Sequence, residues 1–291
     1  MKARATTRRL ATLLLGLAAL ALGPIAPQQR GGTRRALVVG ISRYRSLPQL
    51  NYAAADAELF YDFLRSKAAG SLPDSNIRKL LNEQATAPRI REDLAWLLQA
   101  SKPGDEAIIY FAGLGDAETL TGMQTAFLLA TDASPSNYFA GGAVEVNVLG
   151  QFASGITRKG ATVLVVTDAS RVGKLMDEDG AKRTTAALLE AWNGVTKLVS
   201  SSPDQSSWEG TQWGGGHGVF TWFLVEGLEG LADANGDGVV TLGELWRYVD
   251  DNVMRETAGR QTPASSGDYG HTVAVVDTAT LRAARARMTS R

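Results

Sequence analysis

The sequence predicts an α/β protein of three layers, in which a mostly parallel central sheet of about six strands is covered by helices on both faces. Short apolar runs alternate along the chain with segments whose apolar residues recur at helical spacing. This alternation is typical of parallel sheets with crossover helices. Residues 161–167 are almost wholly apolar, as expected of a central strand that is buried on both faces.

The predicted strands are short apolar runs bounded by polar or turn residues, at 36–41, 77–81, 106–112, 161–167, 196–201 and 272–276. The predicted helices lie between them, at 52–64, 88–100, 144–156, 186–192, 219–231 and 242–255. One more apolar run covers 126–130, and we expect polar loops at 176–185 and 202–216. The pattern indicates one domain over residues 34–278 and a basic tail, a solvated helix end, over 279–291.

The composition excludes several classes of function. The 291 residues include 44% apolar and 21% charged side chains, the usual balance of a globular protein. Lys plus Arg and Asp plus Glu each number 30, so no net charge attracts nucleic acid, and we expect no nucleic-acid partner. The chain has no cysteine, which excludes disulfides, thiolate metal sites and thiol nucleophiles.

The first 26 residues have the pattern of an export signal. Three arginines precede the apolar stretch Leu10–Leu22, which ends at Gly23 and Pro24. The stretch is shorter than the roughly 20 residues of a comfortable membrane span, so we interpret residues 1–26 as a signal peptide. Retention as an N-terminal membrane anchor stays open, and only then would the protein meet a membrane. We expect the mature chain in the periplasm or outside the cell.

Two predicted strands end in short polar turns, at Ile108–Gly115 and Val163–Gly173. Ligands of open parallel sheets bind beyond the carboxyl ends of the strands. Both turns resemble the catalytic strand ends of the caspase and metacaspase family, where the first carries His-Gly and the second Asp-Ala-Cys-Arg. In this chain Leu114 stands at the His position and Ser170 at the Cys position, 56 residues later (170 − 114). The family spacing is about 50 residues.

The resemblance covers about residues 34–276, because the first strand and helix and the segment after residue 200 also resemble bacterial caspase-like domains. It implies a caspase-like fold and an oxyanion hole formed by the backbone N–H groups of Gly115 and Ser170. The catalytic groups are substituted: Leu114 has no titratable atom, and the Ser170 hydroxyl is a weak nucleophile without a nearby base. The oxyanion hole and binding alone leave about 10³–10⁴-fold rate enhancement over water, too little for a peptidase.

We therefore expect a caspase-like cysteine endopeptidase homologue without activity, an exported pseudopeptidase that binds a peptide or a partner protein. One alternative is an active hydrolase that uses Ser170 with a base from elsewhere and cleaves after Arg or Lys. Another is a structural calcium-binding module.

Two acidic residues point to the chemistry of the partner. Asp56 and Asp168 match metacaspase positions that line the pocket for a basic P1 side chain, which implies a partner with basic residues, including an active relative. The residues by themselves also allow Asp56 to cap a helix and Asp168 to brace the Ser170 turn. We expect His217 to anchor a loop or cap a helix, and His271 to be a surface or packing residue.

Residues 233–244 match the EF-hand calcium loop at every required position. Gly238 stands at the sharp turn, and a predicted helix lies on each side. The expected calcium ligands are the residues at loop positions 1, 3, 5, 7, 9 and 12: Asp233, Asn235, Asp237, the Val239 carbonyl, Thr241 and Glu244. We expect a structural Ca²⁺ rather than a sensor site. A metal-free turn stabilised by Asp, Asn and Gly is the alternative.

Overall fold

The computed structural model describes residues 31–118, 123, 125–135, 137–169, 178–190, 192 and 194–289. The expected signal segment 1–26 and Ser170 lie outside the described residues. Within the described ranges, no helix combines the length and the apolar character that a membrane span requires.

The central sheet has six strands in the order β12-β8-β7-β3-β1-β2, and this confirms the predicted fold class. Five strands are parallel, and β12 pairs antiparallel with β8. The strands are β1 (Arg34–Gly40), β2 (Ile77–Leu81), β3 (Glu106–Ala112), β7 (Thr162–Asp168), β8 (Val195–Val199) and β12 (Ala264–Ser266). Because all five parallel strands end at the same edge and β3 pairs with β7, the ends of these two strands are neighbours in space.

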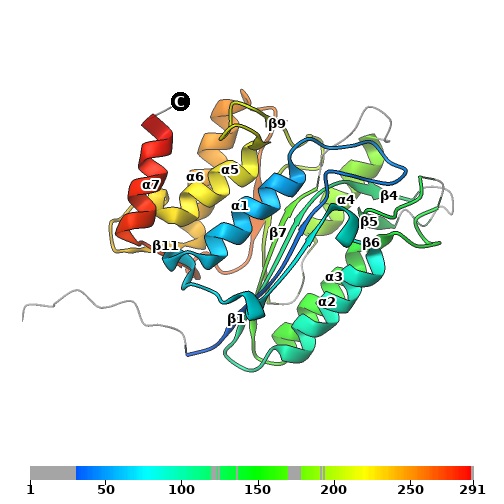
Figure 1. Cartoon of the computed structure of the whole chain (residues 1–291), viewed down its shortest axis with the longest axis horizontal. Helices are drawn as coiled ribbons and strands as arrows, with labels where there is room; N and C mark the ends of the chain where they lie inside the picture. The colour runs from blue at the N-terminus through cyan, green and yellow to red at the C-terminus, as the bar shows by residue number, and fades with distance from the viewer. Residues whose placement is uncertain are drawn as a thin grey trace, which may run out of the picture.

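Helices cover both faces of the sheet, as Figure 1 shows. One face packs against α2 (Ala87–Ala100), α3 (Val146–Arg158) and α4 (Glu178–Leu189). The other packs against α1 (Ala53–Arg65), α5 (Val219–Glu226) and α6 (Leu242–Glu256). Alternate residues of each central strand enter the two cores, for example Ile109 on the first face and Tyr110 on the second. This alternation explains why the middle strands are apolar throughout.

Three small sheets complete the fold. The predicted run at 126–130 forms β5 (Ala126–Leu129), which lies between β4 (Gly115–Ala117) and β6 (Ala143–Glu145) in an antiparallel sheet. A two-residue pair joins β9 (Glu209–Gly210) to β10 (His217–Gly218), so the expected loop at 202–216 is in part a hairpin. The third pairs β11 (Val239–Thr241) with β13 (Thr272–Val275).

The predicted loop at 176–185 is wrong, because α4 begins at Glu178 and runs to Leu189. Gly180 and the polar residues around it lower the intrinsic helix propensity of this segment. Tertiary packing stabilises the helix despite this low propensity. A Cβ at position 180 would lie 1.7 Å from Asp116 Oδ1, so the glycine lets α4 approach β4 closely. The helix predicted at 186–192 overlaps only the last four residues of α4, 186–189.

The sixth strand of the sheet is β12, which the apolar pattern does not mark because its residues are Ala and Ser. The predicted last strand forms as β13 but pairs with β11 outside the central sheet. The predicted helix at 219–231 continues from α5 into a π-helical turn, η4 (Gly227–Leu231), with Gly230 at φ 109°. The basic tail is the helix α7 (Thr278–Thr289), whose Ala284 is fully buried and whose Arg287 pairs with Glu229 of η4.

Candidate functional site

The candidate site lies where β3 and β7 end, because the two strands are paired up to their last residues. Ala112 of β3 stands opposite Asp168 of β7, and the Gly113 N–H donates to the Asp168 carbonyl at 3.2 Å. The turns that carry Leu114 and Ser170 start from these paired ends. The structure describes the first turn, while Ser170 in the second lies outside the described residues.

Leu114, which the sequence resemblance places at the family's His position, is a core residue. Its side chain is 0% exposed and packs in the apolar core on the α2 and α3 face. Its N–H donates to the Tyr44 hydroxyl at 2.7 Å, and its carbonyl accepts from Leu129 N at 2.9 Å. Both backbone groups are therefore used inside the protein. Nothing at this position can take up or release a proton.

Gly115, expected to supply an oxyanion N–H, is covered by α4. A Cβ at this position would lie 2.8 Å from Thr184 Cγ2 and 2.9 Å from the Ala169 carbonyl oxygen. Thr184 itself is 1% exposed. The helix thus packs directly over the backbone that leaves β3, and the strand end is closed rather than open to solvent.

Two buried polar groups hold α4 over the strand ends. Near its start, Asp116 packs against Gly180 and accepts a hydrogen bond from the Tyr138 hydroxyl at 2.7 Å. Burial, followed by this contact, raises the pKa of Tyr138. Near its end, the Lys197 ammonium of β8 donates to the carbonyls of Leu188 and Glu190. Burial lowers the pKa of Lys197 to about 8.

Asp56 lies in the first turn of α1 and is fully buried. Its Oδ1 is 3.0 Å from His217 Nδ1 and accepts from the Gly218 N–H at 3.0 Å. The His217 ring also stacks on Trp222, with centroids 5.4 Å apart. The carboxylate of α1 is therefore used to fix the N-terminus of α5, to which Gly218 is the N-cap.

Asp168 is the last residue of β7 and is also fully buried. Its Oδ2 accepts from the Thr221 hydroxyl at 3.0 Å, and Thr221 lies 2.7 Å from the Tyr110 hydroxyl. Because Gly218 and Thr221 both belong to the first turn of α5, that turn contacts both acidic residues. Two carboxylates at a helix N-terminus are favoured by the helix dipole.

His217 lies at this site, whereas His271 lies at the opposite edge of the sheet, where β3 begins with Glu106. His271 is buried, and its Nε2 lies 2.7 Å from Glu106 Oε1, so it is a packed residue joined to β3 rather than a surface residue. Sequence analysis did not single out Tyr44, Thr184 or Thr221 for the site. Each is an ordinary polar residue in sequence, and only the packing of distant elements brings it to the strand ends.

Comparison with known proteins fits this geometry. The family model for the caspase domain matches residues 33–269. The chain belongs to the caspase-domain family. No curated protein matches the chain in sequence.

Solved structures share the fold of this caspase domain at low sequence identity. A protein from Geobacter sulfurreducens aligns with a TM-score of 0.58 and 17% identity, over 86% of this chain and 96% of its own. Caspase-1 from Spodoptera frugiperda aligns with a TM-score of 0.51 and 12% identity, over 92% and 97% of the two chains. The pro-form of an sf-caspase-1 aligns with a TM-score of 0.53 and 11% identity, over 87% and 99%. These similarities establish the fold alone.

The caspase domain in this chain lacks the chemistry of a cysteine peptidase. The chain contains no cysteine, and Leu114, which the sequence resemblance places at the family's His position, is a buried leucine. The protein is therefore a caspase-like homologue without the thiol that attacks the peptide bond in cysteine peptidases.

The predicted calcium loop joins η4 to α6 and contains a local network of hydrogen bonds. Asp233 accepts from the N–H groups of Gly236 and Gly238 at 2.9 and 3.1 Å. The Glu244 carboxylate instead accepts from the Thr241 N–H and hydroxyl, at 3.0 and 2.7 Å, as a capping box that starts α6. In the part of the chain that the structure describes, no three His, Cys, Asp or Glu side chains are grouped as a metal site.

Proposed function

We propose that this protein is an exported, non-hydrolytic caspase-domain protein that binds a peptide or partner protein with basic residues, and that calcium stabilises its C-terminal part. The observation that carries the proposal is Leu114, a fully buried side chain without a titratable atom at the strand end where the family carries its imidazole. A caspase fold that lacks its catalytic groups can still bind a peptide or a protein at its surface, because one fold can host many functions.

Recognition of a basic side chain is supported by the placement of two carboxylates. Asp56 of α1 and Asp168 of β7 both contact the first turn of α5, next to the end of β7. Both are buried and hydrogen bonded in this conformation, so a guanidinium or ammonium group would replace the contacts of His217 and Thr221. Such an exchange is favourable when the new charge-assisted bonds form away from water.

Calcium binding is supported by the all-oxygen donor set of residues 233–244, which suits a hard cation. Positive φ angles at Gly236 and Gly238 (73° and 87°) give the loop its sharp turns. For Glu244 to become a ligand, its carboxylate would exchange Thr241 for the ion. The ion would then tie the start of α6 to the end of η4, which is a structural role.

Hydrolysis and binding are tested on the same preparation. Fluorogenic peptides with Arg or Lys at P1 should give no turnover above that of a Ser170→Ala variant, with or without calcium. Turnover that this substitution abolishes would establish the active-hydrolase alternative.

Binding is measured by calorimetry with an uncleavable Arg-containing peptide. The isosteric Asp56→Asn, Asp168→Asn double variant should lose that binding, while the exposed-site control Glu83→Gln should keep it. Circular dichroism shows whether the double variant is folded. A folded double variant that binds the peptide as the natural chain does would overturn recognition by these carboxylates and favour the calcium-binding module.

A further inference from the structure

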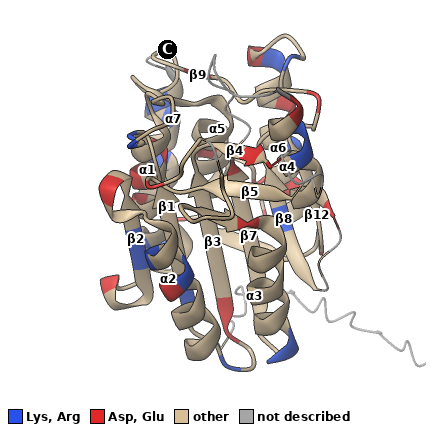
Figure 2. Ribbon diagram, turned by 90° about the vertical axis from the view of Figure 1, so that its right-hand side faces the viewer, with Lys and Arg blue, Asp and Glu red and all other residues tan. Residues whose placement is uncertain are grey.

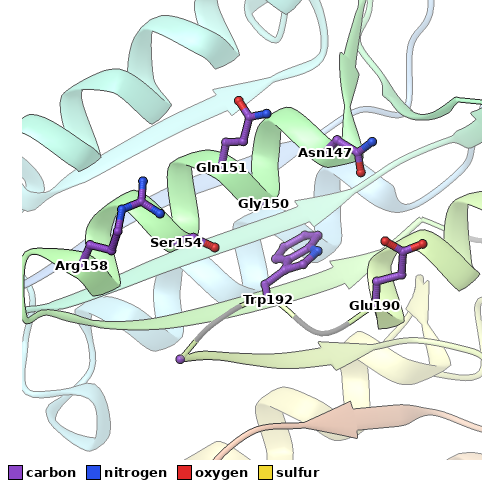
Figure 3. A pocket seen from close by; sticks show the side chains of 8 residues that line it. Asn147, Gly150, Gln151, Ser154, Arg158, Glu190 and Trp192 are labelled. Carbon is purple, nitrogen blue, oxygen red and sulfur yellow. The ribbon is translucent and has the colours of Figure 1, made fainter.

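A groove of about 530 Å³ lies along α3, outside the strand-end site. One wall is a polar stripe of α3 at helical spacing, and the other is formed by Glu190, Trp192 and Gly194, which lie between α4 and β8, as Figure 3 shows for the first two. The residues that contribute polar or aromatic groups are Asn147, Gln151, Ser154, Arg158, Glu190 and Trp192. A volume of this size is typical of binding sites for small ligands or peptide segments.

Trp192 contacts both α3 and β8. Its indole packs against Gly150 so closely that a Cβ there would lie 3.0 Å from Trp192 Cε2. The buried Lys197 ammonium lies 4.5 Å from the ring centroid. The indole therefore adds a large amphipathic surface to the groove, whose N–H can report on a bound ligand.

Most polar side chains of the groove are unused by the fold. Among the described residues, Asn147, Gln151 and Arg158 form no side-chain hydrogen bond or ion pair, and the Glu190 carboxylate has only a Coulombic attraction to the Lys197 ammonium. Their donors and acceptors all line one groove. Two are charged with opposite signs, and they are not paired with one another. In Figure 3 Arg158 lies at one end of the groove, and Glu190 and Asn147 lie toward the other.

We propose that this groove binds an extended peptide segment that carries a carboxylate for Arg158 and, several residues away, a basic side chain for Glu190. From residue 147 to residue 158 the helix rises about 16 Å, which about five extended residues would span. Gln151 lies between the charges and Asn147 lies beside Glu190, where their side-chain amides can donate to and accept from a peptide backbone. The ligand class follows from this order of groups, and the site is independent of Asp56 and Asp168.

The orientation of the charges gives a direct test. The probes are acetyl-Glu-Thr-Val-Thr-Lys-amide, its reversed sequence and the neutral peptide with Gln at both ends, titrated into the ¹⁵N-labelled full chain. Binding should shift the Trp192 indole N–H resonance, and one of the charged peptides should bind best. Arg158→Gln or Glu190→Gln should weaken it about twofold to fivefold, as for exposed ion pairs.

The exchanged variant Arg158→Glu, Glu190→Arg should reverse the preference between the two charged peptides. Arg282→Gln, an exposed arginine of α7, is the matched control and should change nothing. Equal binding of the neutral peptide, an unreversed preference in the exchanged variant, or no shift at Trp192 with millimolar peptide would each overturn the proposal. Because the groove and its Trp192 readout share no residue with the site of Asp56 and Asp168, failure here is distinct from failure of the strand-end site.

Discussion

The two acidic regions of this protein differ in where their carboxylates find partners. Asp56 and Asp168 are fully buried, and their partners Gly218 and Thr221 come from elements far away in the sequence. In the loop at 233–244 the carboxylates lie at the surface or are half-buried, and their hydrogen bonds reach only residues within five positions. Figure 2 shows the wider pattern, with acidic and basic residues interspersed along the outer helices.

Burial therefore determines whether a carboxylate in this fold binds protein groups or remains available to a cation. A buried charge is stable only when protein groups replace its water, so the two buried aspartates are committed to α5. A surface carboxylate keeps its water and remains available to a cation.

Removing a buried carboxylate should cause the largest loss in the free energy of unfolding. Asp56→Ala leaves the Gly218 N–H and the His217 ring without their buried acceptor, so we expect the free energy of unfolding to fall by about 3 kcal/mol. Urea denaturation followed by circular dichroism measures the change. Asp62→Ala, on an exposed position of the same helix, is the control and should stay within about 0.5 kcal/mol. Equal losses of stability in the two variants would show that burial does not determine how much a carboxylate contributes.

Burial also disfavours the charged form of a cationic side chain, as Lys197 shows. Burial lowers the pKa of Lys197 from its ordinary value of 10.5 to about 8. A group with a lowered folded pKa contributes fully above its ordinary pKa and loses that contribution as the pH falls toward about 8. Relative to Lys197→Met, the natural chain should therefore gain stability between about pH 8 and pH 10.5, by at most about 3 kcal/mol. A difference independent of pH would contradict this assignment.

Calcium should have a smaller effect, because a surface loop binds it weakly. With a dissociation constant of about 10⁻⁴–10⁻³ M, roughly 2 mM calcium stabilises the fold by about 1–2 kcal/mol. The melting temperature should rise by a few degrees relative to a chelator. The double variant Asp233→Asn, Glu244→Gln should lose that rise, and magnesium should not replace calcium. An equal rise in the double variant would show that the ion acts elsewhere.

The exposed ion pair between Arg43 and Glu83 should matter least. The hydrogen bond from Arg43 lowers the pKa of Glu83 to about 2, so the attraction is present at neutral pH and is lost only as the pH falls through that value. Both side chains are solvated, and such pairs contribute little to stability. Glu83→Gln should leave the urea midpoint at neutral pH unchanged within error. A loss comparable to that of Asp56→Ala would show that burial is not the deciding variable.

The sequence by itself determined the features that depend on local pattern. The alternation of apolar runs with helical periodicity predicted the layered α/β fold, and five of the six central strands fall where that pattern places them. The absence of cysteine and the leucine at position 114 follow from reading the chain. The motif at 233–244 is local as well, since its residues interact within the loop.

The elements that surround the strand ends depend on tertiary packing and could not be predicted from local sequence. Helix α4 forms despite Gly180 because packing against Asp116 outweighs a weak helix propensity. Strand β12 exists because β8 offers an edge to pair with, although its own residues give no strand signal. The burial of Asp56 by a segment 162 residues away is likewise absent from any local pattern. Contacts of this kind arise from the free energy of packing whole elements together, which no short stretch of sequence contains.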